Sequence, residues 1–326
     1  MKAIVQDRYG PPQEVLSLRE VEAPIPDEDE VLVRVHAAAI HPGDWMVITG
    51  RPYLVRPMFG LPGPRKTTPG FDVAGVVVEV GRSVVEIQPG DEVFGQCNGS
   101  CAEFVAVSPK RLAPKPSNLT YLEAAACPLS GDTALRALRD AGRVRSGHRI
   151  LINGASGGVG TFAVQMGRTM GAEVTGVCSS RNMELVTSLG AHRVIDYTRE
   201  DFTQGEHRYD FILDNVGNQP MAACRRVVAP GGTYVSNNGT SGGRWVGPLG
   251  RTLAALALSA VVPKQGRPFV ALGNQEDLRA LKELLDSGQV QPVIDGTYPL
   301  AEVPTAFQYL EKGHARGKVV IDVASP

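Results

Sequence analysis

Residues 149–160 read Arg-Ile-Leu-Ile-Asn-Gly-Ala-Ser-Gly-Gly-Val-Gly, and this stretch decides the fold. The apolar run Ile150–Ile152 predicts a short buried strand, and apolar residues from Phe162 to Met170 recur at helical spacing. The turn between them is rich in glycine. Strand, glycine turn and helix form a cradle for a pyrophosphate, because unpaired N–H groups and the positive end of the helix dipole point at the ligand. An ordinary glycine-rich turn in an α/β domain is the alternative.

Each glycine of the turn has an expected role. Gly154 suits a tight turn, Gly157 and Gly158 suit a close approach of the main chain to phosphate, and Gly160 suits packing of the helix on the strand. A second strand over residues 171–178 completes a βαβ unit. The predicted phosphate site therefore consists of Gly154, Ala155, Ser156, Gly157, Gly158, Val159 and Gly160.

The pattern on either side of this unit predicts two kinds of structure. From about residue 121, strands (194–196, 209–214, 231–236) alternate with helices (183–189, 221–228), which indicates a doubly wound parallel sheet. Asp132-Thr133 is a plausible helix start. Before residue 120, short strands with Gly and Pro between them suggest a barrel or a small β-domain. Residues 51–69 are Pro-rich yet apolar, which predicts either a substrate-pocket wall or packing over the core.

Length and composition limit the function classes. A chain of 326 residues favours two domains, and its net charge of −1 gives no electrostatic footprint for nucleic acid or an anionic membrane. The apolar run Leu253–Val262 is too short to cross a bilayer and predicts a buried helix or a pocket wall. Five scattered cysteines and the absence of a leader at Met1 predict a cytoplasmic protein without disulfides.

Over nearly its full length the chain resembles the medium-chain dehydrogenase/reductase superfamily. The motifs that carry this resemblance are Met1–Val5, Asp44-Trp45, Pro69–Gly75, Pro89–Val93, Gly154–Gly160, Leu189–Ala191, Asp214–Gly217 and Arg316–Val320. The resemblance implies an α/β protein in which a GroES-like β-domain (residues 1–124 and 268–326) is interrupted by a Rossmann domain (residues 125–267). It also implies that the glycine turn forms the floor of an inter-domain cleft.

Departures from the family pattern point to its zinc-free, quinone oxidoreductase-like branch. Zinc alcohol dehydrogenases place a Cys at or just before the position of Asp44, and their Gly-His-Glu is here Gly70-Phe71-Asp72. The four-cysteine zinc lobe is missing. Cys97 and Cys101 without a nearby His do not complete a tetrahedral site, so we expect ordinary thiols and no metal.

The predicted cofactor is NADPH. Where an NAD site usually ends its second strand with an acid, this chain reads Ser179-Ser180-Arg181, which offers hydroxyl donors and a cation to a 2′-phosphate. A solvated Arg181 at a helix start is the alternative. The resemblance adds Tyr197 near that phosphate and Thr133 near the nicotinamide, although the family's Lys near Asn182 is missing. Strand ends add Asn215, Val216, Gly217, Ser236, Asn237 and Asn238.

The resemblance also supplies candidates for catalysis. Without zinc to polarise a carbonyl, a conjugated enone or quinone is the easier hydride acceptor, and hydrogen-bond donors can stabilise the resulting anion. The candidate donors are His41, Asp44 and Tyr53. Each has a structural alternative: a turn role for His41, helix capping for Asp44 and loop packing for Tyr53.

We therefore predict an NADPH-dependent reductase of quinones, enones or related reactive carbonyl compounds. The alternatives are a zinc-independent alcohol or aldehyde dehydrogenase and a non-catalytic NADPH-binding or redox-sensing protein. Met58, Phe59, Leu61 and Trp245 favour a small, flat hydrophobic substrate. A homodimer is expected from the resemblance, with residues 268–272 as a candidate edge strand.

Overall fold

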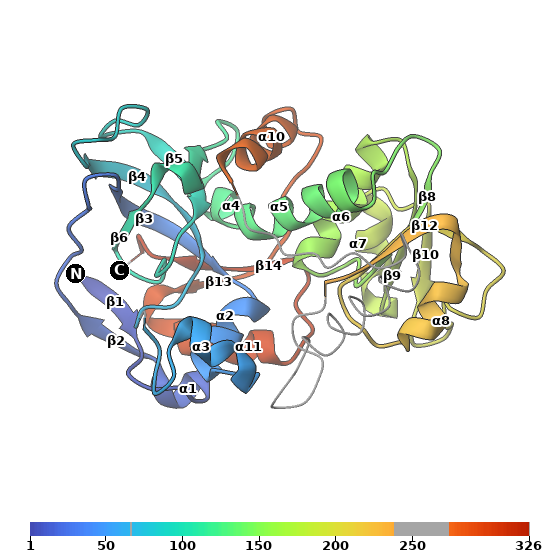
Figure 1. The fold of residues 1–326 in the computed structure, drawn as a ribbon, viewed down its shortest axis with the longest axis horizontal. Coiled ribbons are helices and arrows are strands. Elements are labelled where there is room, and N and C mark those ends of the chain that lie inside the picture. The colour runs from blue at the N-terminus through green and yellow to red at the C-terminus, as the bar shows by residue number, and fades with distance from the viewer. Residues whose placement is uncertain (66, 238–273, 326) are drawn as a thin grey trace. The chain divides into compact units, whose positions relative to one another are not determined.

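The computed structural model describes residues 1–65, 67–237 and 274–325. The chain forms two compact units. The first unit ends at Asp132 and the second begins at Thr133, and the segment from Asn274 onward belongs to the first unit again (Figure 1). The domain boundary predicted from the sequence follows residue 124, which lies in α4 (Tyr121–Ala125). This helix packs on β3 and β4 of the first unit. None of the described helices is both long and apolar enough to cross a membrane.

The first unit is built on a sheet of seven described strands, with a separate antiparallel pair, β1 and β2. The sheet order is β13-β14-β3-β4-β5-β7, and β6 also pairs with β3. The strands are β1 (Lys2–Val5), β2 (Ser17–Glu20), β3 (Val31–Ile40), β4 (Asp72–Val80), β5 (Glu92–Gln96), β6 (Phe104–Val107), β7 (Leu112–Pro114), β13 (Ile294–Pro299) and β14 (Lys318–Asp322). The helices are α1 (Pro12–Val15), α2 (Pro42–Thr49), η1 (Tyr53–Val55), α3 (Arg56–Phe59), η2 (Pro109–Arg111), α4, α10 (Gln275–Asp286), η5 (Leu300–Glu302) and α11 (Val303–Glu311).

The returning strand β14 completes the first unit. It lies between β13, to which it is parallel, and β3, to which it is antiparallel. Its Val319 and Ile321 are fully buried in one core with Val33 and Val73 of the N-terminal strands. Lys318 begins the strand and makes an ion pair of 3.0 Å with Asp72 of β4, and both side chains are buried.

The second unit is a parallel sheet flanked by helices. Its strand order is β10-β9-β8-β11-β12, the doubly wound order, so the direction of winding reverses between β8 and β11. The strands are β8 (Arg149–Asn153), β9 (Glu173–Cys178), β10 (Arg193–Asp196), β11 (Tyr209–Asp214) and β12 (Val228–Ser236). The helices are α5 (Pro128–Arg136, across the unit boundary), the π-helix η3 (Ala137–Ala141), α6 (Gly158–Thr169), η4 (Ser180–Asn182), α7 (Met183–Ser188) and α8 (Met221–Arg226).

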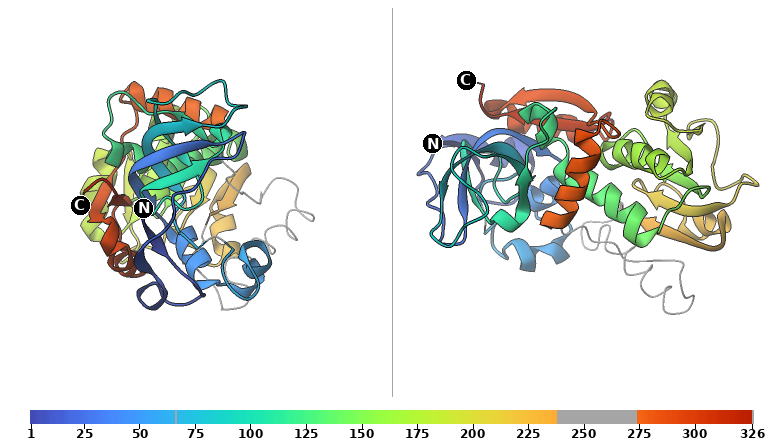
Figure 2. Two further views of the ribbon diagram at one scale, coloured as in Figure 1. Left: turned by 90° about the vertical axis from the view of Figure 1, so that its left-hand side faces the viewer. Right: turned by 90° about the horizontal axis from the view of Figure 1, so that it is seen from above.

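Strand β8, which precedes the glycine turn, forms the centre of this sheet. Ile150, Leu151 and Ile152 have no exposed surface, and α6 buries Phe162 and Met166. Helices α6 and α7 pack on β8, β9 and β10, and the green to yellow part of Figure 2 shows this unit from two further sides. The predicted α/β fold, with a doubly wound parallel sheet, is confirmed.

One helix boundary predicted from sequence was wrong. Asp132-Thr133 is not a helix start, because α5 already begins at Pro128 and runs through both residues. Proline is well tolerated in the first turn of a helix, where its missing N–H has no partner to lose. The predictions for Leu253–Val262, residues 268–272, Trp245, Asn238 and the second domain boundary fall outside the described residues.

A buried carboxylate ties the strand ends of the second unit together. Asp214, at the end of β11, accepts hydrogen bonds from Asn153 Nδ2 at 2.8 Å and from the Tyr234 hydroxyl at 2.6 Å. It also accepts from the N–H groups of Val216 (3.1 Å) and Gly217 (2.8 Å). These donors come from β8, from β12 and from the turn after β11, so this carboxylate fixes the carboxyl edge of the central strands.

The Tyr234 hydrogen bond provides a test of this arrangement. We expect Tyr234→Phe to lower the free energy of unfolding by about 1–3 kcal/mol, because a buried carboxylate oxygen loses its donor while the ring still fills its site. Chemical denaturation measures the change. Tyr209→Phe, at the start of the neighbouring strand, is the matched control and should cost less. Equal stability of Tyr234→Phe and the native protein would contradict the role given to Asp214.

Candidate functional site

The glycine turn has the conformation that a phosphate cradle requires. Gly154 has a φ of 77°, which other residues rarely adopt. A Cβ on Gly160 would lie 2.1 Å from the carbonyl oxygen of Gly154, so only glycine lets α6 pack this closely on the turn. Gly157 caps α6 without a side-chain hydrogen bond. The N–H groups of the first helical turn have no carbonyl one turn earlier, which leaves them available to an anion.

The residues predicted at the ends of β11 and β12 come together beside this turn. Asn215 Nδ2 donates to the carbonyl oxygen of Asn153 at 3.1 Å, and Asn237 Nδ2 donates to Asn215 Oδ1 at 2.8 Å. Val216 is 43% exposed, and a Cβ on Gly154 would lie 2.8 Å from its side chain. Gly217 and Ser236 flank the same edge. Thr133 is buried in α5.

The end of β9 is joined to the glycine turn by a residue that sequence analysis did not select. Asn182 is buried, and its Nδ2 donates to Ser156 Oγ at 2.9 Å. Ser179 precedes η4, and Ser180 and Arg181 are exposed within it. Tyr197, after β10, is 48% exposed.

A second residue missed by sequence analysis is Asp196, whose Oδ2 accepts from Ser180 Oγ at 2.5 Å. It lies at the end of β10, which pairs in parallel with β9 and sets Asp196 opposite Cys178. The available signal was its place at a strand end of the parallel sheet. For the 2′-phosphate, the residues selected from the sequence were Ser179–Arg181 after β9 and Tyr197 directly after Asp196.

In the first unit, His41 and Asp44 form a capping box at the start of α2. His41 Nδ1 accepts from the N–H of Gly43 at 2.9 Å, and Asp44 Oδ2 accepts from the N–H of His41 at 2.8 Å. His41 Nε2 lies 3.4 Å from Asp44 Oδ2, and its ring stacks on Phe71 with centroids 5.5 Å apart. The turn and capping geometries that sequence analysis weighed for these residues are thus present.

Burial determines the charge of this pair. It lowers the pKa of His41 well below its usual range, and the charge of Lys318 lowers it further. His41 is therefore neutral, and because Nδ1 is an acceptor its hydrogen lies on Nε2. Burial also raises the pKa of Asp44 to about 8, with a contribution from the charge of Asp72. Among the described residues no group hydrogen-bonds Asp44 Oδ1.

Asp44 lines a cavity of about 280 Å³ in the first unit. Its wall is mostly apolar or backbone, and includes Val47, Met58, Phe59, Pro69 and Phe71. Of the two alternatives for residues 51–69, this arrangement corresponds to a pocket wall. Arg65, Thr68 and Asn98 also line the cavity and were not selected from sequence. Neither His41 nor Tyr53 is among the lining residues.

Tyr53 lies in η1, away from that lining. The Arg56 guanidinium carbon is 4.7 Å from the centre of the Tyr53 ring and 4.6 Å from that of Tyr9. The cation thus contacts both rings, an arrangement favoured by their negative faces.

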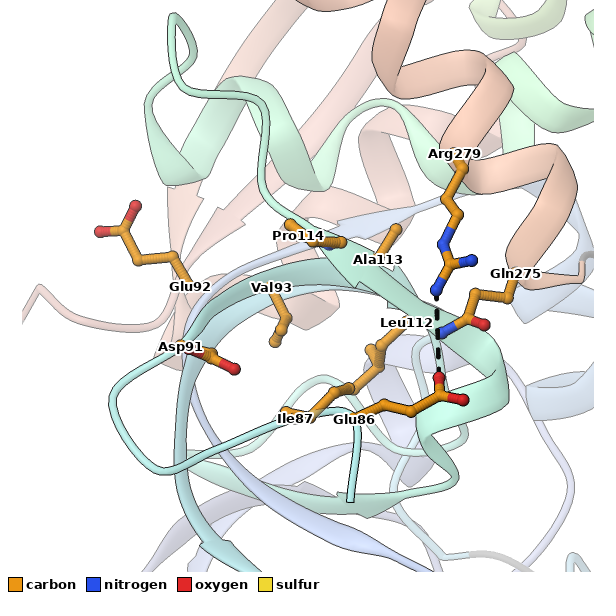
Figure 3. Close-up of a pocket in the computed structure, with 10 residues that line it drawn as sticks. All are labelled: Glu86, Ile87, Asp91, Glu92, Val93, Leu112, Ala113, Pro114, Gln275 and Arg279. Carbon is orange, nitrogen blue, oxygen red and sulfur yellow. Dashed lines mark ion pairs between the residues drawn. The ribbon is translucent and has the colours of Figure 1, made fainter. Parts of the chain in front are cut away.

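A second cavity, of about 320 Å³, lies between β5, β7 and the loop before β5 (Figure 3). Its floor is apolar, with Ile87, Val93 and Leu112, and Arg279 of α10 points toward Glu86 across one end at 3.9 Å. It lacks a buried polar side chain without a partner, so we place no chemistry there.

At the positions where the zinc alcohol dehydrogenases carry their metal ligands, this chain has other side chains. Phe71 takes the place of a histidine, and Asp72 is engaged by Lys318 and by the N–H of Leu129 at 2.9 Å. Cys97 and Cys101 are free and buried, and burial raises the pKa of the Cys97 thiol to about 12. Within the described part of the chain, no three His, Cys, Asp or Glu side chains are grouped to hold a metal ion.

Comparison with known proteins identifies the family. Residues 27–117 match the model of the alcohol dehydrogenase GroES-like domain, and residues 189–321 match the model described as zinc-binding dehydrogenase. The chain is 38% identical to 2-methylene-furan-3-one reductase of Solanum lycopersicum, over 98% of this chain and 79% of the relative. It is 36% identical to the chloroplastic NADPH-dependent alkenal/one oxidoreductase of Arabidopsis thaliana, with the same coverage of 98% and 79%.

Solved structures agree with this result. The quinone oxidoreductase from Coxiella burnetii superposes with a TM-score of 0.84 at 30% identity, and the match covers 99% of both chains. The match thus spans the β-rich unit, the parallel sheet and the returning C-terminal strand. The chain belongs to the medium-chain dehydrogenase/reductase superfamily and is quinone oxidoreductase-like.

Proposed function

We propose that this protein is an NADPH-dependent oxidoreductase that reduces quinones, enones or related reactive carbonyl compounds without zinc. The observation that carries the proposal is the glycine turn at the reversal point of the parallel sheet, together with Arg181 and no acid at the end of β9. The two relatives named above act on an alkenal/one or a methylene-furanone, which supports this substrate class.

The residues of the second unit fit a dinucleotide phosphate. The turn from Gly154 to Gly160 would hold the pyrophosphate. Position 160 requires glycine, because a Cβ there would clash with the Gly154 carbonyl. Ser179, Ser180, Arg181 and Tyr197 would surround the 2′-phosphate. Thr133, Asn215, Val216, Gly217, Ser236 and Asn237 would face the nicotinamide half. When bound, NADPH would supply the hydride.

Arg181 provides the first test of cofactor choice. We expect Arg181→Ala to weaken NADPH binding about tenfold or more and to leave NADH binding within about twofold, because only NADPH has a 2′-phosphate that the guanidinium could pair with. Fluorescence titration with both cofactors measures this. Arg193→Ala is the matched control, since it removes a partly exposed arginine, paired with Glu200, from the opposite end of β10. Equal losses for both cofactors in Arg181→Ala would contradict the assignment.

In the first unit, Asp44 is the group best placed to stabilise an anion on the substrate. Its pKa of about 8 keeps the carboxyl protonated at neutral pH. Oδ2 already accepts from the N–H of His41, so Oδ1 is the oxygen that would carry the proton. There it can donate to an enolate or quinol oxygen as negative charge develops. His41 holds Asp44 through the capping box, and much of the cavity wall is apolar.

The pH dependence of turnover tests this role. The donor is present below pH 8 and is lost as the pH rises through about 8, so turnover should fall about tenfold per pH unit above it. Asp44→Asn keeps the cap and a neutral donor but cannot titrate. Its kcat should be lower and flat from pH 7 to 10.

Asp91→Asn, in the other cavity, serves as the control and should retain the decline of the native protein. The same decline in Asp44→Asn would rule out Asp44 as the titrating donor.

The side chains at the family's zinc-ligand positions support a reaction that needs no metal. Elemental analysis of the purified protein tests whether zinc is bound. One zinc per chain would refute the metal-free reaction.

Oxidation of NADPH by a panel of quinones and enones tests the activity itself. Oxidation of simple alcohols in preference to reduction of enones would favour an alcohol dehydrogenase, and stoichiometric NADPH binding without turnover would favour a binding or redox-sensing protein.

We also propose a cytoplasmic homodimer, on the basis of the resemblance and the cysteine content. Sedimentation velocity should give about twice the chain mass of 34.7 kDa. A species of 34.7 kDa at micromolar concentration would contradict the dimer.

A further inference from the structure

An anionic side chain lies beside the residues proposed to hold the 2′-phosphate. Asp196 is 8% exposed, and its Oδ2 accepts the hydrogen bond from Ser180 Oγ. Its Oδ1 accepts from the N–H of Thr198 at 3.0 Å and from its hydroxyl at 2.8 Å. The hydrogen bond from Ser180, followed by those from Thr198, holds the pKa of Asp196 below its usual range. Asp196 is therefore negatively charged at neutral pH.

The direction of the hydrogen bond limits what Ser180 can offer a ligand. A serine hydroxyl has one hydrogen, and here that hydrogen is donated to Asp196 Oδ2. The remaining lone pairs of Ser180 Oγ cannot bind a phosphate, which presents acceptors and a charge near −2. To bind NADPH, Ser180 would have to withdraw its hydrogen from Asp196, leaving that oxygen unpaired near a second anion.

A free ribose 2′-hydroxyl can bind to Ser180 Oγ in this arrangement, because a hydroxyl can donate a hydrogen bond and a phosphate cannot. The 2′-OH of NADH can donate to Ser180 Oγ, which is an acceptor in this arrangement. Arg181 thus favours the phosphate, while Asp196 opposes it through Ser180. Both effects act at one end of the parallel sheet, since Asp196 and Cys178 are paired residues of β10 and β9.

We propose that Asp196 is a positioning residue for Ser180 that limits the preference for NADPH and allows the site to bind NADH as well. This inference rests on the proposed function in one respect, namely that the ribose of a nicotinamide dinucleotide binds beside Ser179–Arg181.

A purely structural role for Asp196 is the competing explanation, because Asp196 and Thr198 also form a local turn. The chain contains a matched copy of that turn. Asp201 Oδ1 accepts from the N–H of Thr203 at 2.9 Å and from its hydroxyl at 2.8 Å, with no contact to Ser180. Asp201→Asn therefore disturbs the same kind of turn without touching the proposed site.

The main experiment measures dissociation constants of NADPH and NADH for Asp196→Asn by fluorescence titration. Asn keeps an acceptor for Thr198 and can donate through Nδ2 to Ser180 Oγ, which frees the serine hydrogen for the phosphate. We expect NADPH to bind about tenfold more tightly and NADH to change by less than about twofold. The gain should shrink at 0.5 M salt, because part of it is removal of charge repulsion. Asp201→Asn should leave the ratio unchanged.

Ser180→Ala provides a second, independent measurement. In the native background it should change NADPH affinity by less than about twofold, because the hydroxyl hydrogen is already committed to Asp196. In the Asp196→Asn background it should abolish the tenfold gain, so the double-mutant cycle shows strong coupling. A loss of about fivefold or more from Ser180→Ala alone would show that Ser180 already donates to the phosphate, and would overturn the proposal.

The outcomes separate this inference from the proposed function. An unchanged NADPH/NADH ratio in a folded Asp196→Asn protein, or equal weakening of both cofactors, overturns the role of Asp196 alone. Tighter binding of NADH than NADPH by the native protein overturns the proposed NADPH preference, while a shift toward NADPH in Asp196→Asn still supports the role of Asp196. Failure of the native protein and all variants to bind either cofactor overturns both.

Discussion

The carboxylate of Asp214 is the constraint on which the second unit depends. Parallel strands leave polar backbone groups and side chains at one edge of the sheet, and those groups need fixed partners before a ligand can use them. Asp214 joins Asn153, at the end of β8, to Tyr234 of β12, and also holds the turn after β11. The glycine turn begins directly after Asn153. Its position is therefore set by a buried acceptor, and the glycines only permit the conformation.

The buried acids of the first unit differ in whether a cation contacts them. Asp72 keeps a cation, Lys318, within 3.0 Å, whereas Asp44 has only neutral neighbours in direct contact. Desolvation raises the pKa of both acids, and the charge of Lys318, which contacts Asp72, opposes that rise. The same burial keeps His41 neutral. A carboxyl that remains protonated in an apolar cavity can act as a hydrogen-bond donor, a role that an ordinary aspartate cannot fill at neutral pH.

Sequence periodicity was sufficient for the parallel sheet, because its strands carry buried apolar residues and alternate with helical patterns between turn residues. The glycine roles at 154 and 160 could also be predicted, since steric demands are local. The contacts of Asp196 and Asn182 could not. Asp196 reaches Ser180 only because β10 pairs with β9, and Asn182 reaches Ser156 across a turn. The start of α5 was missed because Pro128 was not considered as a first-turn residue. Such partners depend on pairing between segments, which one-dimensional spacing does not record.

The position of β14 has a consequence for synthesis of the chain. Residues Ala37–Ile40 of β3 pair with β14, which follows the second unit in the sequence and is therefore synthesised after it. Until then this half of β3 presents unpaired backbone groups and apolar side chains, while the second unit is already complete enough to fold. Exposed strand edges of this kind favour association between chains. We therefore expect the nascent protein to hold an open sheet edge until β14 has been synthesised, and to depend on chaperones more than a protein whose first domain is contiguous.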